Sequence, residues 1–363
     1  MPAPARRRPG TRPSVAAPAD LRRRRAAAQL LTAGPRSDPP APPDGPANAV
    51  SHLLAVQAQD PRAVRLALRA RGAARHEAEV DAALTIDRSL VAGWLLRGTL
   101  HLVAREDYAW LHALTASLSA ATTRRRLGQL GGDPERAVPV ILRALADDGP
   151  LPRAALAERV AATGIHAEGQ VLPHLLAHAA AAGEVVLGPV RDGAQCFVLA
   201  RDWLDAAERP PDRDAALAEL ARRYLRGHGP ATEADLATWS GLPLRDARAG
   251  LAAITAELEH EGALLDLIRR PPVPKRLPPR LLGAFDPYLL GWCDRGFAVA
   301  PEHARRVHPG GGILRATALA NGRAVGTWAR RRGKVVLEPF EPLPDRVAAA
   351  FQREARDIAR FEA

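Results

Sequence analysis

The sequence predicts a mainly α-helical protein with small β-hairpins, an α+β arrangement of tandem winged-helix domains with a C-terminal β-rich segment. Two observations predict this class. Residues 134–199 read as three helices followed by a hairpin, which is the element order of a winged helix. The segment 229–262 then aligns with the segment 149–183, and such internal repetition indicates tandem copies of one module.

A chain of 363 residues is long enough for two or three compact units. The order of helices, turns and linkers predicts five parts: a disordered Arg/Pro-rich leader at 1–19, a first winged-helix-like domain at 20–130, a second winged helix at 131–205, a third at 206–270, and at 271–363 a linker with a C-terminal β-meander and a final helix.

In the first domain, a Pro-rich loop is predicted at residues 34–47 and a helix from residue 48 to about 57. Asp60 and Pro61 start the next helix, because Asp is a preferred N-cap and Pro fits the first helical turn. A short strand is predicted at residues 99–103. Helices followed by a strand are typical of a winged helix.

Three helices are predicted in the second domain, at about residues 134–148, 152–162 and 167–182. Asp192 and Gly193 then mark the turn of a hairpin, since Asp-Gly is a strong hairpin signal. The predicted third domain repeats this order.

Near the C-terminus, the pairs Asn321-Gly322 and Arg332-Gly333 separate β-rich segments and predict a three-stranded meander. The second turn carries a basic cluster made of Arg330, Arg331, Arg332 and Lys334. A basic tip beside winged helices suits contact with DNA phosphates, whereas a solvated turn that protects a sheet edge fits the same residues.

The net charge of +11 invites a nucleic-acid interpretation, but its distribution weakens the argument. Residues 1–25 hold eight arginines and one acid, so +7 of the charge lies there and +4 is spread over the rest. Composition therefore permits DNA binding without proving it. The sequence has no run of eighteen apolar residues and no secretory signal, and we expect a cytoplasmic, nucleoid-associated bacterial protein without a membrane partner.

Gln57 and Gln59 stand out because they are uncharged amides in an apolar segment. In the predicted helix, Gln57 occupies the apolar face, and a buried amide without partners costs about 1 to 3 kcal/mol. In one continuous helix the two side chains would diverge by about 200°, but a break between helices lets both converge. Such a pair can position a water molecule for hydrolysis of a cationic alkylated purine; an amide that bridges two backbones within the packing is the structural alternative.

Four stretches resemble one protein family: "HLLAVQAQDPRAVRLALRAR", "LVAGWLLRGTLHLV", "GAFDPYLLGWCDR" and "GGILRATALANGRAVGTW". They are similar to the bacterial AlkZ/YcaQ-like winged-helix DNA glycosylases, a group that includes the azinomycin-resistance enzyme and glycosylases of the interstrand-crosslink type. The resemblance runs from about Asp20 to the C-terminus. It implies a concave surface of three winged helices that holds duplex DNA carrying alkylated or crosslinked purines.

The resemblance also implies the activity of a monofunctional glycosylase that hydrolyses the N-glycosidic bond of N-alkylated purines of the N7-alkylguanine type. The role is toxin self-resistance or base excision repair, with unhooking of crosslinks. The family's catalytic element of Gln, an apolar residue and then Gln or Asp matches Gln57-Ala58-Gln59. By the same resemblance, Arg97 and His101 of "RGTLH" are expected to contact DNA, with a structural role as the alternative.

No cofactor is expected, and we expect a monomer. His174 and His178 lie one helical turn apart but lack a third metal ligand, so no metal site is predicted. The glycines at 310–312 lack the Lys and Ser/Thr of a phosphate loop, which argues against a nucleotide. Cys196 and Cys293 form no metal motif. The competing interpretation is a non-enzymatic winged-helix DNA-binding protein or transcriptional regulator.

Overall fold

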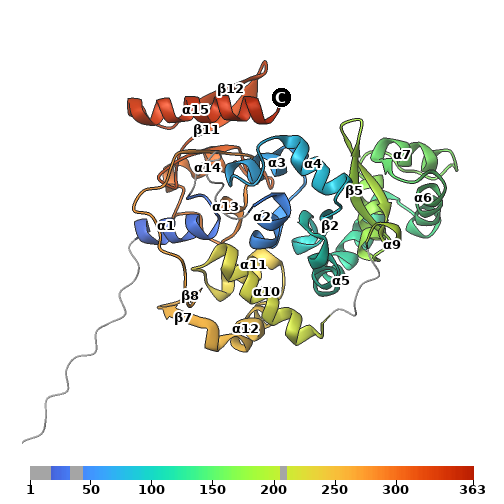
Figure 1. The fold of residues 1–363 in the computed structure, drawn as a ribbon. Coiled ribbons are helices and arrows are strands. Elements are labelled where there is room, and N and C mark those ends of the chain that lie inside the picture. The colour runs from blue at the N-terminus through green and yellow to red at the C-terminus, as the bar shows by residue number, and fades with distance from the viewer. Residues whose placement is uncertain (1–17, 33–43, 205–210) are drawn as a thin grey trace, which may run out of the picture.

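The computed structural model describes residues 18–32, 44–204 and 211–363. The predicted leader up to residue 17 and most of the Pro-rich loop lie outside the described residues. The fold is mixed, with helices predominating and small antiparallel sheets, as the sequence predicted (Figure 1).

The first part of the chain contains most of the helices and strands that surround Gln57 and Gln59. They are α1 (Pro18–Ala28), α2 (Pro46–Leu53), β1 (Val56–Gln57), α3 (Pro61–Ala70), α4 (Glu77–Thr85), β2 (Leu90–Trp94), a 3₁₀ turn (Leu96–Gly98), β3 (Leu100–Ala104) and α5 (Arg105–Leu130). The carboxylate of Asp60 accepts hydrogen bonds from the backbone N–H groups of Arg62 and Ala63, at 3.0 and 3.2 Å, and so caps α3 as predicted.

The helix predicted from residue 48 to about 57 is shorter, and its end is a correction. α2 stops at Leu53, because Leu54 adopts a left-handed backbone conformation with φ of 69°. Val56 and Gln57 then pair with β3 as a short strand. Gln57 therefore lies in a sheet, and the helical spacing that placed it beside Val50 does not apply.

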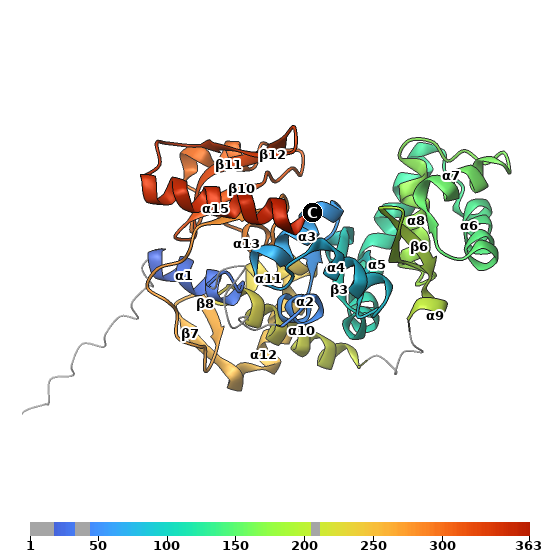
Figure 2. The same cartoon turned by 45° about the horizontal axis from the view of Figure 1, so that its top comes forward.

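The second part follows the predicted order of three helices and a hairpin. Its elements are α6 (Pro134–Asp148), β4 (Leu151–Pro152), α7 (Arg153–Ala161), α8 (Val171–Ala181), β5 (Val185–Arg191), β6 (Ala194–Leu199) and α9 (Ala200–Trp203). Asp192 and Gly193 both have positive φ, at 50° and 74°, which is the backbone geometry that favours Asp-Gly in a tight hairpin. α6, α7 and α8 project as a lobe from the side of the molecule (Figure 2).

One sheet continues through the first two parts. Its six strands run in the order β1-β3-β2-β5-β6-β4, and Ala92 in β2 pairs with Leu187 in β5 at the junction. The strands of the first and second parts thus form one antiparallel sheet. β1, which contains Gln57, is the edge strand of this sheet, and only β3 lies between β1 and β2. The junction of β2 with β5 is therefore close to the glutamines.

The third part repeats three helices and a hairpin, with α10 (Arg213–His228), α11 (Glu233–Ser240), α12 (Leu244–Ala253), a 3₁₀ turn (Thr255–Glu257), β7 (Leu258–Glu261) and β8 (Leu264–Leu267). An aromatic cluster ties it to the C-terminal part. Tyr224 stacks on His228 with ring centroids 4.8 Å apart, and Trp292 meets the His228 ring edge-on at 5.5 Å.

The C-terminal part contains β9 (Arg280–Leu282), α13 (Pro287–Leu290), a 3₁₀ turn (Pro301–His303), α14 (Ala304–Val307), β10 (Thr317–Ala320), β11 (Arg323–Arg331), β12 (Lys334–Pro339) and α15 (Asp345–Phe361). The predicted meander forms, and β9 adds a fourth strand in the order β12-β11-β10-β9. α15 lies along this sheet at the top of the molecule, above α3 (Figure 1).

Buried ion pairs fasten α3 to the C-terminal part. Arg71 binds Asp286 with both side chains fully buried and a shortest N–O distance of 2.9 Å. Arg69 contacts Glu354 at 3.1 Å and Asp357 at 2.8 Å, also in the interior. Charges removed from water in this way are tolerated because each is paired and hydrogen-bonded. α3 begins two residues after Gln59, so these pairs also fix the helix that follows the glutamines.

Candidate functional site

Gln57 and Gln59 come together at the edge of the six-stranded sheet. Gln57 lies opposite His101 in the β1–β3 pairing, and Gln59 lies in the connection between β1 and α3. The Nε2 atom of Gln57 donates a hydrogen bond to Oε1 of Gln59 at 2.8 Å. Gln57 is half-buried and Gln59 is exposed, so the pair opens to solvent. The prediction that both amides meet at a break in the chain is confirmed, although a strand and not a helix leads into the break.

Arg97 reaches the pair from the 3₁₀ turn between β2 and β3. Its Nη2 donates to Oε1 of Gln57 at 3.3 Å, and its Nη1 donates to the carbonyl oxygen of Trp239 at the end of α11. Gly241 packs so tightly here that a Cβ on it would lie 3.0 Å from the backbone nitrogen of Arg97. The third part of the chain therefore helps to position the residue behind Gln57.

The arginine fixes the direction of the hydrogen bonds. A guanidinium group only donates, so the Gln57 atom that faces it has to be the carbonyl oxygen. The amide nitrogen of Gln57 then points to Gln59 and requires an oxygen there. Burial lowers the pKa of the Arg97 guanidinium, yet arginine remains cationic in proteins. The two amides are therefore oriented by a permanent donor.

His101 supports this arrangement from the neighbouring strand. It is buried, with 2% of its surface exposed, and its Nδ1 lies 2.9 Å from the carbonyl oxygen of Thr99. That contact makes Nδ1 the donor and leaves Nε2 as the acceptor, 3.4 Å from Nη2 of Arg97. Burial, together with the nearby Arg97 charge, lowers the pKa of His101 to about 3. The imidazole is neutral near pH 7.

These positions change the prediction that Arg97 and His101 contact DNA. The guanidinium of Arg97 is engaged by protein oxygens, and the ring of His101 is enclosed by the sheet. The β1–β3 pairing sets His101 opposite Gln57. Arg97 lies in the 3₁₀ turn before β3, and its guanidinium is turned to Gln57 and to the carbonyl oxygen of Trp239. Their geometry fits the structural alternative, that of residues that orient the glutamines.

The glutamine pair retains hydrogen-bonding capacity. Gln57 has a second N–H group, and Gln59 has its own amide N–H groups and a second lone pair on Oε1. A water molecule can be held between such donors and acceptors. Neither amide is a general base near neutral pH, so the site suits a reaction in which placing water matters more than removing its proton.

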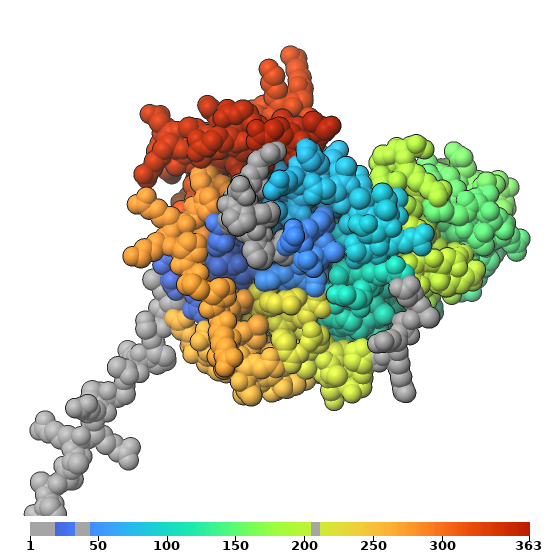
Figure 3. Space-filling view, in the orientation of Figure 1, coloured from blue at the N-terminus to red at the C-terminus, as the bar shows by residue number. Residues whose placement is uncertain are grey.

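The basic cluster lies at the tip of the β11–β12 hairpin, which protrudes from the molecule (Figure 3). Arg330 pairs with Glu362, and Arg331 pairs with Glu338 at 2.6 Å. Arg332 and Lys334 are exposed and have no ion-pair partner among the described residues. The tip is therefore partly neutralised, and two of its four cations remain available to an anionic partner.

The two histidines that lie one helical turn apart in the sequence are on α8. His174 and His178 lie on α8, where burial lowers the pKa of each. Among residues 18–32, 44–204 and 211–363, no group of three or more His, Cys, Asp and Glu side chains is placed to hold a metal ion. Within the same residues, no helix is long and apolar enough to cross a membrane.

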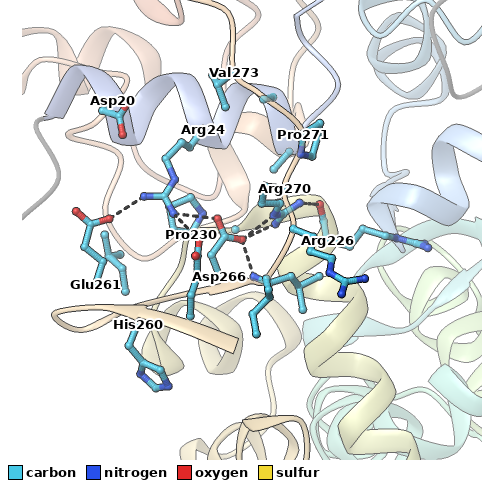
Figure 4. Close-up of a pocket in the computed structure, with 18 of the residues that line it drawn as sticks. Asp20, Arg24, Arg226, Pro230, His260, Glu261, Asp266, Arg270, Pro271 and Val273 are labelled. Carbon is cyan, nitrogen blue, oxygen red and sulfur yellow. Dashed lines mark hydrogen bonds and ion pairs between the residues drawn. The ribbon is translucent and has the colours of Figure 1, made fainter. Parts of the chain in front are cut away.

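Two cavities differ in their relation to the glutamines. A groove of about 1170 Å³ starts at Gln59 and runs between the shared sheet and α7. A second cavity of about 850 Å³ lies between α1 and the β7–β8 hairpin (Figure 4). Several of its charges pair with one another, because Arg24 binds Glu261 at 2.7 Å and Asp266 binds Arg270 at 2.7 Å. The ion pairs of the second cavity therefore link α1 with the third part of the chain. The groove, and not this cavity, adjoins the candidate site.

Three contributors to the site could not be identified from the sequence. The carbonyl oxygen of Trp239 and the close approach of Gly241 come from the third part of the chain, and no sequence pattern connects them with residue 97. Trp94, which lines the groove beside Gln59, reads in sequence as an ordinary strand aromatic. The pairing of β2 with β3 brings it there.

The comparisons with known proteins agree with this fold and identify the family of the chain. The profile of the family described as "DNA glycosylase AlkZ-like" matches residues 50–361. An interstrand DNA cross-link repair glycosylase from Streptomyces sahachiroi is 28% identical over 355 residues, covering 90% of this chain and 92% of the relative. The solved structure of the S. sahachiroi DNA glycosylase AlkZ superposes with a TM-score of 0.73 at 25% identity, covering 96% of this chain and 97% of that one. The chain belongs to the AlkZ-like DNA glycosylase family.

Proposed function

We propose that this DNA glycosylase hydrolyses the N-glycosidic bond of N7-alkylated purines in duplex DNA, and that Gln57 and Gln59 position the attacking water. The observation that supports this most directly is the oriented amide pair, in which Gln57 donates to Gln59 at 2.8 Å beside an open groove. Arg97 and His101 act behind the pair as positioning residues and do not touch the substrate.

The chemistry of the substrate explains why amides suffice. Alkylation at N7 places a positive charge on the purine, so the base departs as a neutral molecule and leaves an oxocarbenium-like sugar. A good leaving group reduces the need for a general acid, and a cationic sugar reduces the need for a strong nucleophile. The protein then has to hold water against the developing cation, which the amide oxygens and N–H groups can do.

The wider substrate and the setting are also proposals. The S. sahachiroi relative is named as an interstrand crosslink repair glycosylase, and we infer that this chain unhooks crosslinks that pass through N7 of a purine. We infer that the parts of the chain act as winged-helix units of one monomer that holds duplex DNA. The exposed Arg332 and Lys334 would contact phosphates from the β11–β12 hairpin. We place the protein in the bacterial cytoplasm, with the nucleoid.

The test uses a duplex oligonucleotide with a single N7-methylguanine. After incubation, alkali cleaves any abasic site, and a shorter strand reports excision. Gln57→Ala and Gln59→Ala are each expected to lower the single-turnover rate by about 10² or more while DNA affinity stays within a few-fold. Gln352→Ala is the matched control, since Gln352 is exposed on α15.

Two outcomes would count against the proposal. Unchanged single-turnover rates in the Gln57→Ala/Gln59→Ala double variant would remove the glutamines from the reaction. Absence of any shorter strand with the native chain, together with strong preference for one DNA sequence, would favour a non-enzymatic regulator.

A further inference from the structure

A single carboxylate joins the start of α3 to the β11–β12 hairpin. Glu362 follows directly after α15, and only 6% of its side chain is exposed. Nε of Arg62, in the first turn of α3, donates to Oε1 of Glu362 at 2.7 Å, and Nη1 of Arg330, in β11, donates to Oε2. Two segments that are far apart in the sequence thus meet at the two oxygens of one side chain, and we call this contact the Arg62–Glu362–Arg330 bridge.

The α3 end of the bridge is close to the glutamine pair along the chain. Arg62 is three residues after Gln59, and three residues span at most about 11 Å. Between them, the carboxylate of Asp60 accepts a hydrogen bond from the backbone N–H of Arg62 at 3.0 Å and fixes the first turn of the helix. The bridge therefore begins on a backbone that the helix cap holds next to Gln59.

The hairpin end of the bridge holds the turn at the tip. Nε of Arg330 donates to the carbonyl oxygen of Gly333 at 3.2 Å, across the turn that carries Arg332 and Lys334. The same guanidinium group therefore binds Glu362 and the backbone between the two exposed cations. Because protein oxygens engage Arg330, it fixes the direction of the tip and is not one of the cations that the tip offers to a partner.

A second ion pair on the same hairpin provides a comparison. Successive side chains of a strand point to opposite faces, so Arg331 points away from Glu362. It binds Glu338 at 2.6 Å with both side chains exposed, and this pair joins the two strands of the hairpin. Exposed pairs of this kind are weakened by water, whereas Glu362 is withdrawn from water and shared by two guanidinium groups. Of the two contacts, the bridge is the one that transmits a position from α3 to the tip.

We propose that Glu362 is a positioning residue for base excision, because it sets the place of the hairpin tip relative to the glutamine pair. DNA phosphates held by Arg332 and Lys334 are then in register with a purine at Gln57 and Gln59. The inference rests on the glycosylase function and on the phosphate contact proposed above. Glu362 itself touches neither DNA nor the attacking water. Without the bridge, the tip still binds phosphates, but the purine is no longer delivered to the amides in one fixed orientation.

The first experiment measures single-turnover excision of N7-methylguanine from a duplex at saturating protein, together with the Kd of the same duplex. Glu362→Gln keeps the shape of the side chain, but its amide nitrogen is a donor and faces an arginine that also only donates. The saturating rate is expected to fall by about tenfold or more, as for a misplaced substrate, while Kd rises by no more than about threefold.

The matched control is Glu338→Gln, which makes the same substitution in the exposed pair of the hairpin. It removes the contact between the two strands and leaves the bridge to α3 in place. Its saturating rate should stay within about twofold of the native rate.

A double-variant cycle provides a readout that a purely structural role of Glu362 leaves unchanged. In the native chain, Arg332→Ala/Lys334→Ala removes the phosphate contacts of the tip and is expected to lower the saturating rate by about fivefold or more. In the Glu362→Gln chain the tip is already misplaced, so the same two substitutions should lower the rate by less than about twofold. A residue that only stabilises the fold would leave the two ratios equal.

Arg330→Gln tests the bridge from its hairpin end. It should reproduce the fall in rate of Glu362→Gln, and the variant with both substitutions should be no slower than either alone. If circular dichroism shows that Glu362→Gln does not fold, Arg330→Gln takes its place in the cycle with Arg332 and Lys334.

The outcomes separate this inference from the proposed function. A saturating rate of the bridge variants within about twofold of the native rate overturns the positioning role and leaves the glycosylase intact. An equal fall in the Glu338→Gln control overturns it as well, and so does an equal effect of the tip substitutions with and without the bridge. Absence of excision by the native chain overturns the proposed function itself, and the present inference with it.

Discussion

Nε2 of Gln57 donates to Oε1 of Gln59 at 2.8 Å, across the point where a two-residue strand ends and α3 is about to begin. The two side chains are separated by one residue, and in an extended strand residues i and i+2 project to the same face. Pairing with β3 therefore aligns the amides, and Asp60 turns the chain immediately afterwards. The geometry depends on a strand and on a helix cap together.

Replacing Gln59 by glutamate should keep the hydrogen bond and add a titratable group. A carboxylate oxygen at this position can accept from Gln57 as the amide oxygen does, so Gln59→Glu is expected to retain excision of N7-methylguanine within about tenfold of the native rate at pH 7.5. As the pH falls from about 6 to about 4.5, the variant should slow while its carboxylate takes up a proton.

The native chain should show a nearly flat profile over the same range, because neither amide titrates and the pKa of His101 is about 3. Single-turnover rates across the pH series provide the check, corrected for base loss without protein. Parallel profiles for the native chain and Gln59→Glu would mean that residue 59 does not act on the water.

Arg97 should affect the chemical step and not DNA affinity. Arg97→Met removes the donor that orients Gln57, and misplaced catalytic groups typically cost about 10- to 100-fold in rate. Arg97→Lys keeps a donor and should recover part of the loss. A phosphate contact would behave differently, since its removal weakens binding and lowers the salt dependence of Kd. Single-turnover rates and binding isotherms at several salt concentrations distinguish the two roles, and a fall in affinity alone contradicts ours.

Local signals in the sequence predicted most of the fold. The Asp60 cap, the Asp192-Gly193 turn and the Asn321-Gly322 turn were all readable because each depends on a few adjacent residues. The end of α2 could not be predicted in this way, because Leu54 carries no helix-stopping signal. It adopts φ of 69° only when the chain must enter the sheet. Strand β9 is short and follows a Pro-rich linker, so its own residues do not predict a strand. It is recognised only from its pairing with β10 in the structure.

The sequence predicted which two glutamines form the candidate site, but not which other residues contact them. The spacing of Gln57 and Gln59 indicated a pair from sequence alone, whereas the role of Arg97 depends on a backbone carbonyl 142 residues away, at Trp239. Such long-range contacts form only when three parts of the chain pack together. The sequence left the role of His101 open for the same reason, since its burial comes from the neighbouring strand.

The hairpin tip should contribute unequally to DNA binding. Arg332→Ala and Lys334→Ala remove exposed cations without an ion-pair partner among the described residues, and each should lower the magnitude of the salt slope of binding by about one. Arg331→Ala should change the slope less, because Glu338 already neutralises that arginine at 2.6 Å. Fluorescence anisotropy across a KCl series measures the slopes. Three equal effects, or none, would argue against a phosphate contact at this tip.

Acid should destabilise the fold through its buried histidines. Burial lowers the pKa of His101 and of His228 to about 3 and that of His52 to about 4, against an unfolded value near 6.5. Between these values the unfolded chain binds more protons than the folded chain, so the free energy of unfolding is highest above pH 6.5 and falls as the pH drops towards 3. Each histidine contributes a slope of about 1.4 kcal/mol per pH unit within its window.

Urea unfolding between pH 7.5 and 4 measures this slope. His228→Gln keeps a polar group beside Tyr224 and should reduce the slope by about one histidine's share, whatever its effect on stability at pH 7.5. Gln352→Ala, which changes an exposed residue of α15 without a titratable group, should leave the slope unchanged. A slope that is the same in all three proteins would show that other groups control acid unfolding.

The Arg71–Asp286 pair should be the most sensitive point of the interface between α3 and the C-terminal part. Both side chains are fully buried, and Asp286 also caps α13 by accepting from the N–H of Tyr288. Asp286→Asn keeps an acceptor for the cap but leaves the arginine unpaired in the interior, and such a change typically costs about 3 to 5 kcal/mol. Glu233→Gln breaks the exposed pair with Arg248, and we expect a loss of at most about 1 kcal/mol. Urea unfolding at pH 7.5 compares the two variants; equal losses would mean that burial does not set the strength of these pairs.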